Sequence, residues 1–80
     1  MNHKQVYMKG FDLYPDAIVL CEVCGKVAVD IHHILFKSQL GTDEIENLIA
    51  LCRDCHDIAH GKVKNETLTR GDLYLITNAR

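Results

Sequence analysis

The stretch NLIALCRDCHDIAHG, residues 47–61, determines the fold more than any other part of the sequence. Its first part, residues 47–51, is a short and mostly apolar run that predicts a strand. Residues 53–60 then predict a helix, which Gly61 ends because glycine readily adopts the left-handed conformation found after helices. Two cysteines with the spacing C-x2-C, Cys52 and Cys55, stand where the strand gives way to the helix.

A second pair of cysteines with the same spacing, Cys21 and Cys24, precedes this stretch. Residues 21–25 predict a tight turn, in which Gly25 supplies the positive φ that such turns often need. Two C-x2-C pairs separated by 27 residues are the pattern that places four thiolates around one Zn²⁺. Four buried free cysteines and two disulfides are the alternatives, and the regular spacing disfavours both.

A metal site of this kind would matter for stability because the chain has only 80 residues. An apolar core of this size supplies roughly 3–5 kcal/mol, whereas structural zinc contributes about 10–16 kcal/mol in small zinc peptides. The sequence shows neither a membrane-spanning apolar segment nor a signal peptide. We therefore expect a cytoplasmic protein without a membrane partner, in which paired cysteines bind metal more often than they form disulfides.

The segments before residue 47 predict short elements. Residues 3–11 predict a helix with Val6, Met8 and Phe11 partly buried. Residues 27–31 are β-branched and apolar, which predicts a strand. Residues 37–46 are polar and predict a loop, whose acidic side chains at Asp43, Glu44 and Glu46 are expected to face solvent.

The C-terminal segment predicts one more helix, over residues 70–78. Thr69 and Asp72 have the spacing of a capping box, in which each side chain accepts a hydrogen bond from the backbone of the other residue. Leu73, Leu75 and Ile76 would form the buried side of this helix.

Histidines occur in two groups of chemical interest. His56 and His60 are four residues apart in the predicted helix, so they share one face and can chelate one ion. His32 and His33 are adjacent at the end of a predicted strand, where neighbouring side chains point to opposite faces. Both can serve one site only if the backbone bends there, and we expect such a bend because a polar loop follows. Asp30 lies on the His32 side and would orient its ring.

His3 stands apart from both groups. It has no partner in the sequence, and we expect it to be an ordinary surface residue.

Three motifs in order, C-x2-C-G, D-I-H-H-I and N-L-I-A-L-C-x2-C-H-x3-H-G, resemble the zinc-stapled HNH endonucleases. The likeness covers residues 21–61 and is strongest to the small forms carried by phages and prophages. It implies a small α+β fold, with a ββα-metal core, a structural zinc site made of four cysteines, and short flanking helices. It further implies a single HNH nuclease domain over residues 1–80, encoded by a prokaryote or a phage and acting on DNA.

The resemblance implies a role for each matched residue. His33 would be the general base, and Asn47 would tie the loop across the two strands and hold His33 in place. The catalytic divalent cation would be bound by His32, His56 and His60. The structural zinc would be bound by Cys21, Cys24, Cys52 and Cys55.

These roles predict a metal-dependent endonuclease that hydrolyses DNA phosphodiester bonds. Neutral imidazole can deprotonate water near pH 7, and a divalent cation can stabilise charge on the phosphate and the leaving oxygen. Because all three predicted ligands are imidazoles, we expect Mn²⁺, Ni²⁺ or Co²⁺ to serve at least as well as Mg²⁺. Zn²⁺ would bind this site more tightly and turn over more slowly.

Two other functions remain open from the sequence. The net charge of −2 counts against a protein that binds nucleic acid through its whole surface. A zinc-stapled DNA- or protein-binding module without its own cleavage activity is one alternative. A subunit of a larger phage packaging or restriction complex is the other. One site per chain predicts nicks by a monomer and double-strand breaks by a homodimer.

Overall fold

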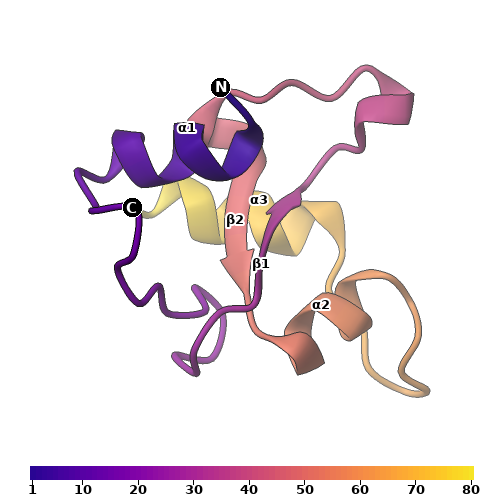
Figure 1. Cartoon of the computed structure of the whole chain (residues 1–80). Helices are drawn as coiled ribbons and strands as arrows, with labels where there is room; N and C mark the ends of the chain where they lie inside the picture. Colours follow the sequence, from indigo (N-terminus) through magenta and orange to yellow (C-terminus); the bar gives the residue numbers. More distant parts are fainter.

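The computed structural model describes residues 1–80, and two short antiparallel strands lie at its centre (Figure 1). Strand β1 spans Asp30–His33 and strand β2 spans Leu48–Leu51, with His32 opposite Ile49. Helix α2, Arg53–Ala59, follows β2 after one residue. The order of β1, β2 and α2 gives a ββα unit in a small α+β fold, as the sequence predicts.

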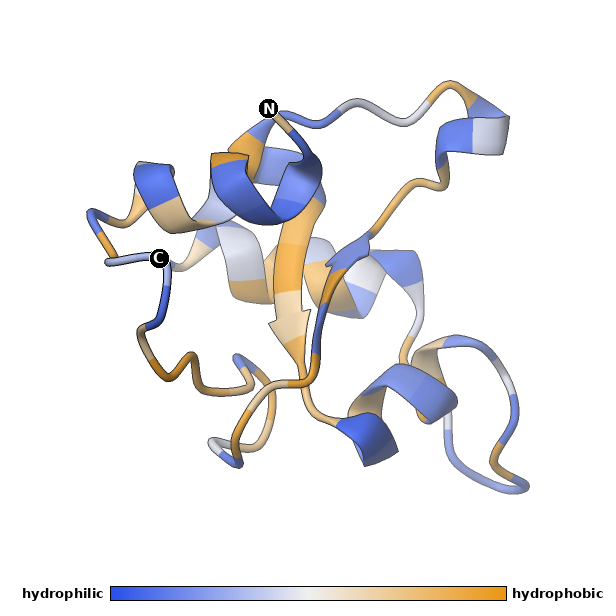
Figure 2. Ribbon diagram, in the orientation of Figure 1, coloured by the Kyte–Doolittle hydropathy of each residue, from blue (hydrophilic) through white to orange (hydrophobic).

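The two remaining helices pack on opposite faces of this sheet. Helix α1 spans His3–Gly10, and helix α3 spans Arg70–Asn78. The buried cluster on the α1 side contains Tyr7, Met8, Ile31, Leu48 and Ala50. The buried cluster on the α3 side contains Ile34, Ile49, Leu51 and Leu73, together with Cys21, Cys52 and Cys55. Because β2 supplies side chains to both clusters, all four of its residues are buried, and Figure 2 shows it apolar along its length.

The first predicted strand begins later than expected, at Asp30 rather than at residue 27. Val27 forms only an isolated bridge with Leu20, and the N–H of Ala28 donates to the carbonyl of Val19 at 2.8 Å. Residues 19–28 therefore pair with one another around the turn at Cys21 and Cys24, and only Val29, whose N–H donates to the carbonyl of Leu51 at 2.9 Å, continues the contact of β1 with β2.

The predicted helices are present, with local differences. The N–H groups of the capping box at Thr69 and Asp72 are bonded as expected, and Gly61 has a φ of +72° after α2. Leu75 was expected to be buried but is 72% exposed, whereas Thr77 is buried. Thr77 lies one helical turn beyond Leu73 and shares its face, while Leu75 points the other way.

The predicted loop 37–46 contains the 3₁₀ turn η1, Lys37–Gln39, and leads into the turn η2, Ile45–Asn47. Phe11, expected to be partly buried, is 38% exposed just after α1.

No helix of the chain combines the length and the apolar character needed to cross a membrane.

A carboxylate, rather than a third strand, closes the outer edge of β2. The N–H of Ala50 donates to the Glu22 carboxylate at 3.0 Å, and the N–H of Glu22 donates to the Ala50 carbonyl at 2.9 Å. The same carboxylate accepts hydrogen bonds from the Tyr7 hydroxyl at 2.8 Å and from the Arg80 guanidinium at 2.8 and 2.9 Å. Arg80 also donates to the carbonyl of Leu48. Glu22 thus links the first cysteine turn to β2, α1 and the end of α3.

We expect Glu22→Gln to destabilise the chain at neutral pH by about 1–3 kcal/mol, because several buried donors lose a charged acceptor. Burial alone raises the pKa of Glu22, but hydrogen bonds from Arg80, Ala50 and Tyr7 outweigh it and lower the net value. Because the pKa of Glu22 is lower in the folded than in the unfolded chain, its carboxylate stabilises the fold at every pH above the unfolded pKa. This stabilisation is lost only as the pH falls from there through the folded pKa. The stability difference between parent and variant should therefore stay constant from pH 8 to pH 6 in urea unfolding. Equal stability at pH 7, or the same loss in the exposed control Glu46→Gln, would contradict this role.

Candidate active site

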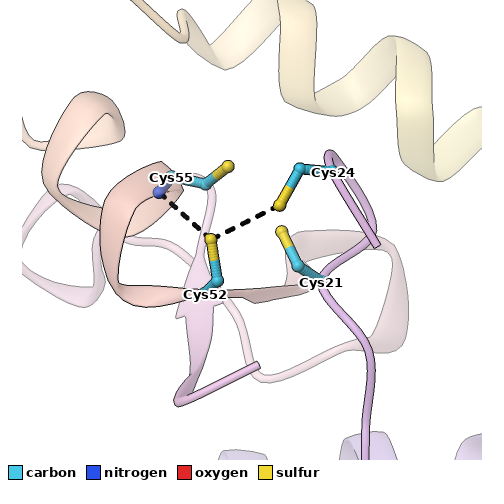
Figure 3. A group of neighbouring side chains, drawn as sticks. All are labelled: Cys21, Cys24, Cys52 and Cys55. Carbon is cyan, nitrogen blue, oxygen red and sulfur yellow. Dashed lines mark hydrogen bonds between the residues drawn. The ribbon is translucent and has the colours of Figure 1, made fainter. Parts of the chain in front are cut away.

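The sulfur atoms of the four cysteines converge on one point (Figure 3). Cys21 and Cys24 lie in the turn before β1, whereas Cys52 caps α2 and Cys55 lies in its first turn. The Sγ atoms of Cys24 and Cys52 are 3.5 Å apart, and all four lie within 4.8 Å of one another. A Zn–S bond of about 2.3 Å in a tetrahedral site places sulfurs about 3.8 Å apart. The four side chains therefore fit a structural Zn²⁺, and none of them forms a disulfide.

The backbone around Cys21 favours its thiolate form. Gly25 has a φ of +83°, and its N–H donates to the carbonyl of Cys21 at 2.9 Å, which closes the predicted turn. Burial by itself raises the pKa of Cys21, but backbone N–H groups of Cys52, Cys24 and Val23 lower it to about 7. Zinc binding requires deprotonated cysteines, so the lowered pKa of Cys21 favours loading of the site, whereas burial raises the pKa of Cys55.

Three imidazoles form a second cluster, between β1 and α2. His32 comes from β1, His56 lies on α2, and His60 ends that helix one turn later. The Nε2 atoms of His56 and His60 are 3.1 Å apart, and one nitrogen from each of the three rings lies within 4.8 Å of the others. Three converging nitrogens fit a divalent cation such as Mn²⁺, Ni²⁺, Co²⁺ or Zn²⁺.

The surroundings of this cluster lower the pKa of two of its imidazoles, those of His32 and His60. His32 is 5% exposed, and burial, followed by the neighbouring His60 and His56, lowers its pKa to about 4. Burial and His56 also lower the pKa of His60. Phe36 packs edge-on against His32 and stacks on His60, with ring centroids 5.8 and 5.5 Å away. Neutral imidazoles offer the lone pairs that a metal ion needs.

His33 lies outside this cluster, because β1 ends at His33 and the backbone bends at Ile34 and Leu35, just after the histidine pair rather than between the two histidines. Strand β1 keeps its alternation: His32 pairs with Ile49, which packs on the α3 side, and His33 pairs with Leu48, which packs on the α1 side. The two histidines nevertheless border one surface hollow of about 390 Å³ at the end of the strand. A single substrate in that hollow could meet both side chains.

Two residues that the sequence placed at the surface contact His33. The His33 Nε2 atom lies 2.7 Å from Oδ1 of Asp43, whose Oδ2 lies 3.3 Å from the ammonium nitrogen of Lys37. The ring centroid of His3, in the first turn of α1, is 4.5 Å from that of His33. No spacing rule connects positions 3, 33 and 43, because the contacts form only when α1 and the loop pack around the end of β1.

Asp30 lies on the His32 face of β1, as predicted, but contacts a different ring. Its Oδ2 atom is 3.1 Å from Nε2 of His56. The carboxylate does not join the group of three converging imidazoles. It adjoins that group at its exposed side, since the Asp30 side chain is 47% exposed.

Asn47 joins four backbone and side-chain groups around the loop after β1. Its Nδ2 donates to the carbonyls of Leu35 at 3.0 Å and Thr42 at 2.8 Å. Its Oδ1 accepts hydrogen bonds from the N–H of Leu35 at 2.8 Å and from the hydroxyl of Tyr74 at 2.9 Å. The amide is buried and leaves none of its hydrogen-bonding atoms without a partner. It therefore ties the loop to both β2 and α3.

We expect one tightly bound zinc per chain, and loss of cooperative unfolding in Cys24→Ser or after prolonged chelation, because the core is small. Elemental analysis and thermal unfolding by circular dichroism measure both properties. Ser38→Ala, outside the cysteine cluster, provides the control and should retain the metal. A cooperative transition in protein shown to be free of metal would contradict the prediction.

Comparison with known proteins agrees with this geometry. A sequence model of a family described as HNH endonuclease matches residues 21–62, a little more than half of the chain. Searches of curated proteins and of solved structures gave no match. The matched region contains both cysteine pairs, β1, β2 and α2, and all of the histidines except His3. The chain therefore belongs to the HNH endonuclease family, whose domains bind DNA and use divalent metals.

Proposed function

We propose that this chain is a metal-dependent endonuclease that hydrolyses DNA phosphodiester bonds, acting as a single HNH nuclease domain over residues 1–80. The observation that carries the proposal is the hollow at the end of β1. His33 borders it from one face of the strand and His32 from the other. A phosphate bound there would lie beside a general base and beside a cluster of metal-binding imidazoles.

His33 is the proposed general base. A neutral imidazole removes a proton from water, whose oxygen then attacks phosphorus in line with the bond to the leaving oxygen. The phosphorus–oxygen bond breaks to give a 5′-phosphate, and a second water molecule protonates the leaving oxygen to give a 3′-hydroxyl. The His33 side chain is 14% exposed, which leaves it accessible to a water molecule.

His32, His56 and His60 are the proposed ligands of the catalytic cation. When bound, a divalent cation supplies Lewis-acid stabilisation of the charge on the phosphate and the leaving oxygen. His32 is fixed by burial in the sheet and His56 by helix α2. The proposed role of Asn47 is to hold the loop after β1, which keeps the two histidine side chains at the rim of the hollow.

The net charge of −2 favours a second candidate, a DNA- or protein-binding accessory module without independent cleavage. A module of this kind would work inside a larger assembly, for example a packaging or restriction complex. The two candidates differ in one observable, because only the first cuts DNA as the purified chain. If the purified chain binds duplex DNA but does not cut it in the presence of Mn²⁺, Ni²⁺, Co²⁺ or Mg²⁺, the second candidate is favoured.

Replacement of His33 tests the proposed base. We expect His33→Ala to retain its zinc content and melting temperature while its rate of plasmid nicking falls by roughly 10²-fold or more. Gel separation of supercoiled and nicked plasmid measures the rate. Cleavage by the variant at the parental rate would refute the assignment.

The metal preference tests the three-imidazole site. Mg²⁺ favours oxygen ligands, so we expect Mn²⁺, Ni²⁺ or Co²⁺ to support nicking at least as well as Mg²⁺. Rates with each metal, measured for the parent and for Asp30→Asn, decide between two ligand sets. A clear Mg²⁺ optimum that disappears in Asp30→Asn would make Asp30 a ligand and overturn the site of imidazoles alone.

A further inference from the structure

We propose that Asp43 is a positioning residue that fixes the tautomer and the orientation of His33, an inference that rests on the proposed role of His33 as base. The contact that carries it is the 2.7 Å approach of Asp43 Oδ1 to His33 Nε2. Asp43 lies ten residues away in the loop before β2, and its side chain is 35% exposed. An acidic side chain in an exposed loop thus points inward to one ring nitrogen.

The contact determines which nitrogen of His33 carries the hydrogen. The hydrogen bond from His33 and the pairing with Lys37 both lower the pKa of Asp43, so its carboxylate is ionised at neutral pH and can only accept. Nε2 must therefore carry the hydrogen, which leaves Nδ1 with the lone pair that removes a proton from water. The imidazolium formed in that step keeps its Nε2–H bonded to an anion, and Asp43 remains ionised throughout. A carboxylate orients the imidazole of a catalytic triad by the same logic.

Asn47 and Gly41 hold this carboxylate in place. Asn47 bonds to the carbonyl of Thr42, directly before Asp43, and to both backbone groups of Leu35, two residues after His33. Gly41 packs so closely on the carbonyl of Leu35 that an added Cβ would overlap it. These contacts hold the backbone next to Asp43 against the backbone just after His33. The two hydrogen-bonded side chains therefore come from segments that are fixed relative to each other.

Lys37 makes the asparagine variant informative. In the parent, one carboxylate oxygen accepts from His33 and the other pairs with Lys37 at 3.3 Å. In Asp43→Asn, an amide oxygen turned to Lys37 leaves the amide NH₂ facing His33 Nε2. That NH₂ favours the opposite tautomer, with the hydrogen on Nδ1, and so removes the base. Alanine at the same position would leave Nε2 free to donate to water.

The tautomer of His33 can be measured without DNA. In ¹⁵N–¹H correlation spectra of the zinc-loaded protein, we expect the Nε2–H form in the parent and in Asp43→Glu. We expect the Nδ1–H form to appear in Asp43→Asn. A parent spectrum dominated by the Nδ1–H form would overturn the inference. So would an unchanged spectrum in Asp43→Asn.

Cleavage kinetics supply the second readout. We expect Asp43→Asn to lower kcat for plasmid nicking by about 10-fold or more, with KM changed less than about twofold and with Asp43→Ala less impaired than Asp43→Asn. Glu44→Gln removes the same charge one residue away and should leave the rate unchanged. Zinc content and melting temperature, measured for every variant, exclude loss of fold.

The kinetic outcomes separate this inference from the proposed function. An inactive His33→Ala with a fully active Asp43→Asn would overturn the role of Asp43 and leave His33 as the base. Parental cleavage by His33→Ala would refute the proposed base, and the inference that rests on it would fall as well. If the purified parent does not cut DNA, the spectra decide whether Asp43 sets the tautomer.

Discussion

The convergence of four cysteine sulfurs on one point is the constraint on which the rest of the structure depends. The two cysteine pairs bracket the sheet: Cys24 lies shortly before β1, and Cys52 directly follows β2. A metal ion that holds both pairs fixes the start of one strand beside the end of the other. Two strands of four residues could not define this register alone, since an isolated two-stranded ribbon is marginally stable in water.

The four-cysteine site also determines where α2 lies, in addition to the register of the strands. Because Cys52 caps the helix and Cys55 lies in its first turn, the cysteine site also sets the direction in which α2 leaves the sheet. His56 follows Cys55 immediately, and His60 lies one turn farther on. Their approach to His32 on β1 is therefore governed by the same four sulfurs. The four-cysteine site and the three-imidazole site are therefore both built on helix α2 and the pair of strands β1 and β2.

The ordinary alternation of β1 divides the chemistry between two faces. His32 turns toward α2, where burial keeps its imidazole neutral, and His33 turns toward α1 and the loop that carries Asp43. The overall negative charge does not oppose this arrangement, because the ionised groups nearest the hollow form pairs. Asp43 is held by His33 and Lys37, and Asp30 lies against His56. Asp30 and Lys37 both line the hollow, so a phosphate there would meet one carboxylate and one ammonium group beside the imidazoles.

Sequence alone determined the parts of this protein that depend on local spacing. Four features depend only on residues close together in sequence, so the chain predicts them: the C-x2-C spacing of each cysteine pair, the H-x3-H spacing on one helix, the capping box at Thr69 and the apolar run of β2. Only the tertiary structure decided what packs around His33. Asp43 and His3 reach it from a loop and from α1, and the start of β1 shifted because residues 19–28 pair with themselves. No helix or strand periodicity relates the segments that make these contacts, so the sequence does not predict them. The contacts form because burial of two apolar clusters brings α1, the loop and the sheet together.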